Sequence, residues 1–106
     1  MSQSEFSKII LSTVDESLST LGDSPKQAIM FHLENSFNIK KETIPTNITD
    51  FVKALEEIFG PGASYLEKLI VKHINAKLSL TSEDIEKMDF LEYVEQLKRR
   101  LLSKEG

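Results

Sequence analysis

Residues 47–78 read NITDFVKALEEIFGPGASYLEKLIVKHINAKL, and this segment carries the clearest signal of secondary structure in the chain. On both sides of its glycine–proline–glycine corner, apolar residues recur every three or four positions, which is the spacing of an amphipathic helix. Glycine and proline together favour a break in a helix. We therefore predict one helix that is capped by Asn47 and ends at the corner 60–62, and a second helix over 63–78.

Two more helices are predicted on the N-terminal side of this stretch. Residues 4–21 show helical spacing, and Gly22 follows them, where a left-handed residue commonly ends a helix. The next helix is expected to begin at an N-cap Ser24, with Pro25 in its first turn and Gln27 completing a capping box. Its apolar residues are spread widely enough to predict contacts on more than one side: Ala28, Ile29, Phe31, Leu33 and Phe37.

A connector and one last helix complete the chain. Proline disfavours a helical conformation of the residue before it, so Ile44 is predicted to be extended and to anchor the connector in the core. The last helix is predicted over 82–103, after an imperfect capping box that starts at Thr81. Its first half is acidic and its end is basic, which complements the helix dipole.

These patterns predict an all-α fold, with residues 1–106 as a single domain of about five helices in an irregular bundle. A chain of 106 residues with 40% apolar residues is long enough to bury a core without disulfides, and it contains no cysteine. The predicted core is Ile10, Val14, Leu18, Ile29, Leu33, Phe51, Leu55, Ile58, Phe59, Leu66, Leu69, Ile70 and Ile74.

Charge and composition narrow the classes of partner. The formal net charge is −4 and the pI is about 5.2, which argues against nucleic acid and anionic membranes as partners. The sequence has no basic leader and no long apolar run, so we expect neither secretion nor a membrane span, and we predict a cytoplasmic protein.

Catalytic and ligand-binding motifs are missing from the sequence. The two histidines, His32 and His73, lie on different predicted helices, and neither has a metal-ligating neighbour four residues on. The corner 60–62 lacks the lysine of a phosphate-binding loop. We therefore predict no catalytic, cofactor-binding or metal-binding residue, no cofactor, and a protein that is not an enzyme.

Two interaction surfaces are predicted instead. Spacings of four, three and four in the last helix form an apolar seam of Phe90, Val94, Leu97 and Leu101, which would bind a protein partner or a second copy of the chain. The alternative is a DNA-binding regulator with a helix-turn-helix-like corner at 60–62. In this alternative, helix 63–78 would present Lys68, Lys72 and Asn75 to DNA. The net negative charge of the chain argues against it.

Residues 17–80 also resemble a known family. The features that carry the resemblance are Leu21-Gly22, Ala28-Ile29 with Phe31-His32-Leu33, Ile44-Pro45, Ile58-Phe59-Gly60, Gly62-Ala63 and Leu66-Glu67. They resemble the Nitrosopumilus output domain family, a small helical output domain of archaeal signalling proteins. The resemblance implies a regulatory module in an archaeal cytoplasm and carries over no catalytic residue. Taken with the apolar seam, it leads us to expect a non-enzymatic signalling interaction module.

Overall fold

The computed structural model describes residues 1–80 and 89–102. Within them there are five α-helices and two short 3₁₀ segments but no strand, which confirms the predicted all-α class. The elements in chain order are α1 (Gln3–Ser19), α2 (Asp23–Phe37), η1 (Lys41–Thr46), α3 (Ile48–Phe59), η2 (Gly60–Gly62), α4 (Ala63–Leu78) and α5 (Phe90–Leu102).

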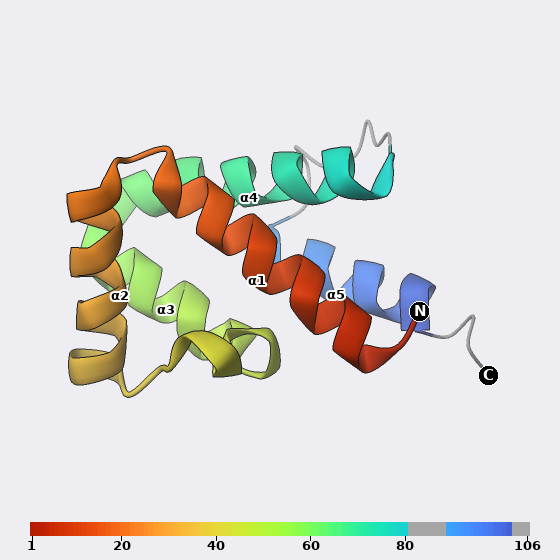
Figure 1. Cartoon of the computed structure of the whole chain (residues 1–106), viewed down its shortest axis with the longest axis horizontal. Coiled ribbons are helices and arrows are strands. Elements are labelled where there is room, and N and C mark those ends of the chain that lie inside the picture. Colours follow the sequence, from red (N-terminus) through yellow and green to blue (C-terminus); the bar gives the residue numbers. More distant parts are fainter. Residues whose placement is uncertain (81–88, 103–106) are drawn as a thin grey trace.

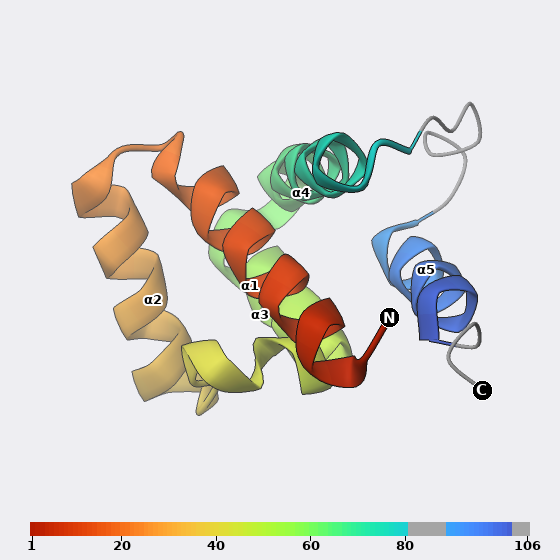
Figure 2. The ribbon, with the colours of Figure 1, turned by 45° about the vertical axis from the view of Figure 1, so that its right-hand side comes forward.

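Helix α1 occupies the centre of the arrangement. It contacts α2, η1, α4 and α5. Figures 1 and 2 show α2 at one edge of the molecule and α5 towards the opposite side, and Figure 2 shows α3 behind α1. The N-terminal helix therefore joins elements that follow it along the whole described chain.

One continuous core lies between these helices. Of the predicted core residues, Ile58, Phe59 and Leu69 are only partly buried at its edge, and the others are buried. The structure adds Phe6 at the start of α1 and Ile44 of η1, both with no exposed surface, together with much of α5. Ile44 thus anchors the connector, as predicted.

The starts of α1 and α2 differ from the prediction. Helix α1 begins at a capping box that sequence reasoning missed, in which the Ser2 hydroxyl accepts a bond from the Glu5 backbone N–H at 3.1 Å. Helix α2 begins at Asp23 with Gly22 as its N-cap, so the predicted Ser24 cap is wrong. Gly22 has φ 104° and ψ 161°, a conformation that suits glycine and lets the chain enter α2 two residues earlier.

The connector is helical where an extended residue was predicted. Ile44 lies within the 3₁₀ segment η1, in which the Asn47 N–H donates to the Ile44 carbonyl at 3.1 Å. Burial of both Ile44 and Pro45 outweighs the bias against a helical residue before proline. Asn47 precedes α3 as predicted, but its backbone carbonyl, not its side chain, bonds to the first turn.

The last helix begins later than predicted. Asp89 is not helical, and its carboxylate accepts a 2.7 Å bond from the Glu92 backbone N–H, so Asp89 caps α5. An uninterrupted helix over 82–103 is therefore wrong at Asp89. The predicted cap at Thr81 and the remaining residues of 81–88 and 103–106 lie outside the described residues.

Candidate functional site

The seam predicted to bind a partner faces the body of its own chain. Phe90, Val94 and Leu97 are 4–5% exposed, and α5 contacts α1, α3 and α4. Leu101 is half-buried. A partner can therefore reach only the last of these four residues, and the exposed face of α5 is polar, with Glu92, Glu95, Gln96 and Arg99.

A partly buried hydrogen bond joins α5 to α4. The Tyr93 hydroxyl donates to Asn75 Oδ1 at 2.6 Å, and Tyr93 is 7% exposed. Burial raises the pKa of Tyr93 to about 12. Asn75 was predicted to read DNA in the alternative model, but the structure ties its oxygen to α5.

The two lysines of the DNA-binding alternative are both exposed. Lys68 and Lys72 lie four residues apart on α4, and Tyr65, on the same side, is 66% exposed. Glu67, however, lies in the N-terminal half of α4, beside Lys68. Burial, followed by the nearby charges of Glu56 and Asp89, raises the pKa of Glu67 above its usual value. Negative charges at the end that would enter a groove repel phosphates.

The two histidines have local structural contacts. His73 Nδ1 lies 3.2 Å from Glu16 Oε2, and Lys77 lies 3.0 Å from the other oxygen of that carboxylate, so both contacts join α4 to α1. His32 Nδ1 lies 3.1 Å from the Ser36 hydroxyl one turn along α2. Among the described residues, no three histidine, aspartate or glutamate side chains form a group that could hold a metal ion.

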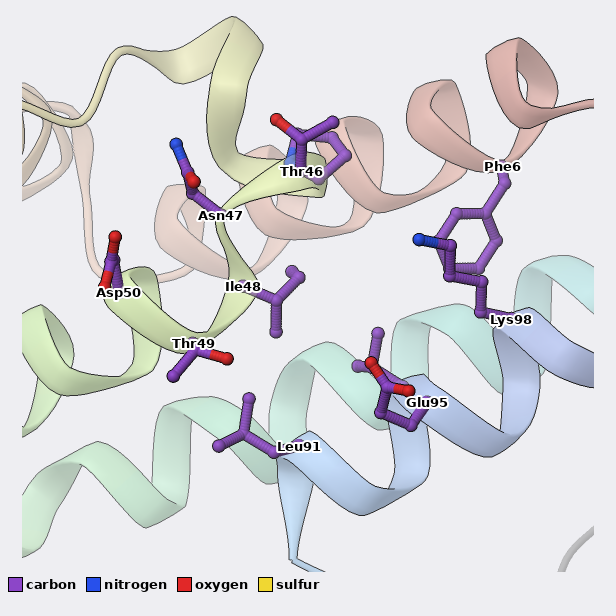
Figure 3. Close-up of a pocket in the computed structure, with 11 residues that line it drawn as sticks. Phe6, Thr46, Asn47, Ile48, Thr49, Asp50, Leu91, Glu95 and Lys98 are labelled. Atoms are coloured by element: carbon purple, nitrogen blue, oxygen red, sulfur yellow. The ribbon is translucent and has the colours of Figure 1, made fainter.

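A cleft of about 320 Å³ separates α5 from η1 and the start of α3. Figure 3 shows side chains of Thr46 to Asp50 on one side and Leu91, Glu95 and Lys98 on the other. Phe6, Pro45 and Val94, all buried, also line it. Its size is at the lower end of the range for small-molecule sites.

The residues that line this cleft are chemically mixed. The described lining of the cleft includes the hydroxyls of Thr46 and Thr49 but no histidine, serine or cysteine. Its charged groups are the carboxylates of Asp50 and Glu95 and the amine of Lys98, which do not select one sign of ligand charge.

The outer face of α2 carries an exposed aromatic side chain. Phe31 is 68% exposed, the highest value for a large apolar side chain in the described part of the chain, and Ala28 beside it is also exposed. The inner face of α2 buries Ile29 and Leu33. Contacts on a second side of this helix were predicted from the sequence, but no described residue covers Phe31.

The seam predicted on α5 is largely buried, whereas α2, which the sequence did not single out, carries the exposed Phe31. The signal that identifies α2 is the absence of charge. Between Lys26 and Glu34 the helix has no acidic or basic residue other than His32, although 28% of all residues are charged. An exposed helical face without charge is unusual on a solvated surface.

Comparisons with family models, with curated proteins and with solved structures find no match for this chain. The resemblance of residues 17–80 to a signalling output domain therefore stays a prediction. No helix of the described residues is long and apolar enough to cross a membrane.

Proposed function

We propose that this chain is a non-enzymatic interaction module that binds a protein through the outer face of α2. The observation that carries the proposal is the aromatic ring of Phe31, exposed on an uncharged helical face. Complete burial of a phenylalanine side chain contributes about 1.5–3 kcal/mol. Aromatic residues are enriched at the centres of protein interfaces, so Phe31 would be the anchor of the contact.

A signalling or regulatory role in the cytoplasm is part of this proposal. It rests on the family resemblance of residues 17–80. The apolar seam on α5 contributes little to partner binding in this proposal, because Phe90, Val94 and Leu97 are buried.

Site-specific photocrosslinking tests the proposal. A photoreactive phenylalanine analogue replaces Phe31 in one protein and Tyr65 in a control, because these two side chains are similarly exposed, at 68% and 66%. We expect a discrete adduct, in the cell of origin, from position 31 and not from position 65. Equal background labelling at the two positions would refute an interface on α2.

A further inference from the structure

We propose that the partner of α2 is a second copy of this chain, packed antiparallel across a two-fold axis. This inference rests on the proposed function and names the partner. Ser24, Ala28, Phe31 and Asn35 are all exposed. At 100° per residue they lie within an arc of about 60°, roughly opposite the buried Ile29 and Leu33.

The spacing of this α2 seam, formed by Ser24, Ala28, Phe31 and Asn35, is that of two packed helices. The steps of four, three and four residues are those of the contact positions in a coiled coil. Figures 1 and 2 both show α2 at the edge of the molecule, so its outward side is open to another body. Nothing else in the described chain reaches this seam.

The order of residues along the α2 seam makes it complementary to itself. When two copies pack antiparallel about the midpoint between Ala28 and Phe31, each phenylalanine ring lies over the alanine of the other copy. A large residue against a small one lets helices approach closely. Ser24 then lies opposite Asn35, whose Nδ2 already donates to the Phe31 carbonyl at 2.9 Å, and whose Oδ1 can accept a hydrogen bond from the Ser24 hydroxyl of the other copy.

The distribution of charge favours the α2 seam as the interface and an antiparallel packing of the two helices. Two copies with a net charge of −4 repel each other, so a shared interface must avoid like charges. The outward faces of the other helices expose Lys53 and Glu56 on α3, Lys68 and Lys72 on α4, and Glu92 and Arg99 on α5. The α2 seam has none, and antiparallel packing keeps the two Glu34 side chains apart and opposes the helix dipoles.

The interface is small, so the dimer is weak. One helix of 15 residues from each copy buries less than a standard interface, and we expect a dissociation constant on the order of tens of micromolar. Sedimentation equilibrium of the full chain over a concentration series measures it. Phe31→Glu and Ala28→Glu should each raise the dissociation constant at least about 30-fold, whereas Tyr65→Glu on α4 should not change it.

Engineered disulfides test the direction of packing, because the chain has no cysteine of its own. Ser24→Cys chains mixed with Asn35→Cys chains should form a disulfide-linked dimer under mild oxidation. Either variant alone should not, because its two thiols would lie about 16 Å apart along the axis. Circular dichroism confirms that each variant is folded.

The outcomes separate the two proposals. A disulfide formed by Ser24→Cys alone would overturn the antiparallel arrangement. A wild-type chain that stays monomeric at all concentrations, with position 31 still crosslinked to another protein, would overturn self-association and leave the interaction module standing. A monomer without any specific adduct at position 31 would overturn both.

Discussion

The hydrogen bond from Tyr93 to Asn75 gives the sharpest test of how α5 is held on the bundle. Replacing Tyr93 by phenylalanine keeps the buried ring and removes only the hydroxyl that donates at 2.6 Å. Asn75 is half-buried, so water replaces part of the lost bond. A typical net hydrogen bond contributes about 0.5–1.5 kcal/mol, and an acceptor left without a donor adds to the loss. We expect the free energy of unfolding to fall by about 1–1.5 kcal/mol.

Urea unfolding, followed by far-ultraviolet circular dichroism, measures this change. The matched control is Tyr65→Phe, which removes the same hydroxyl from a side chain that is 66% exposed, and which should leave the midpoint unchanged. In a domain of this size the loss in Tyr93→Phe corresponds to about 4–6 °C in melting temperature. Equal urea midpoints for Tyr93→Phe and the wild type would refute a stabilising role for the bond.

The buried hydroxyl of Tyr93 also makes the free energy of unfolding depend on pH above about pH 10. Burial raises the pKa of Tyr93 to about 12, so the folded state holds this proton more tightly than the unfolded state, in which the pKa is about 10. Its contribution to stability is complete below pH 10 and is lost as the pH rises towards 12, by about 2–3 kcal/mol. Tyr93→Phe lacks this group, so its stability should fall less steeply over that range than the wild type's.

Three further predictions concern charged residues. Lys26, whose amine lies 2.7 Å from the Asp15 carboxylate, is the main cause of the lowered pKa of Asp15. The carboxylate therefore stabilises the fold above the pKa of the unfolded state, near 4, and this stabilisation is lost as the pH falls through the lower pKa of the folded state. Asp15→Asn should flatten the loss of stability between about pH 5 and 3, and an unchanged pH dependence in this range would contradict the prediction. Asp89→Ala should lower the free energy of unfolding by about 1 kcal/mol in urea titrations, whereas Asp89→Asn, which can still cap α5, should preserve most of it. In a gel-shift assay at low and high salt, DNA should migrate equally with the wild type and with the double variant Lys68→Gln, Lys72→Gln. A salt-dependent shift by the wild type that the double variant abolishes would instead support the DNA-binding alternative.

The all-α class and the approximate bounds of α1, α2, α3 and α4 could be predicted because local signals agree with tertiary packing there. Apolar residues at helical spacing place Ile10, Val14 and Leu18 on one buried face of α1. Gly22 marks the break between α1 and α2, and Gly60 marks the break between α3 and α4. Where several local signals agree, the fold needs little information from distant residues.

The errors arose where tertiary contacts override a local rule. The preference of residues before proline for an extended backbone predicted an extended Ile44, but the complete burial of Ile44 stabilises a 3₁₀ turn there. The seam on α5 has the spacing of a partner-binding surface, but spacing alone does not tell which body covers an apolar face. In contrast to that buried seam, Phe31 is exposed. Its exposure depends on which side of α2 packs on α1 and α3, and only the structure reveals that side.

The corner between α3 and α4 has a consequence for chirality. Gly60 adopts φ 58° and ψ −132°, which is the mirror image of the polyproline II region that L-amino acids favour. An L-alanine Cβ at this position would meet nothing within 4 Å, so its cost of about 1–3 kcal/mol would come from the backbone alone. A D-amino acid, whose allowed regions are inverted, suits this backbone. The direction in which α4 leaves α3 is thus set by a residue that has no handedness of its own.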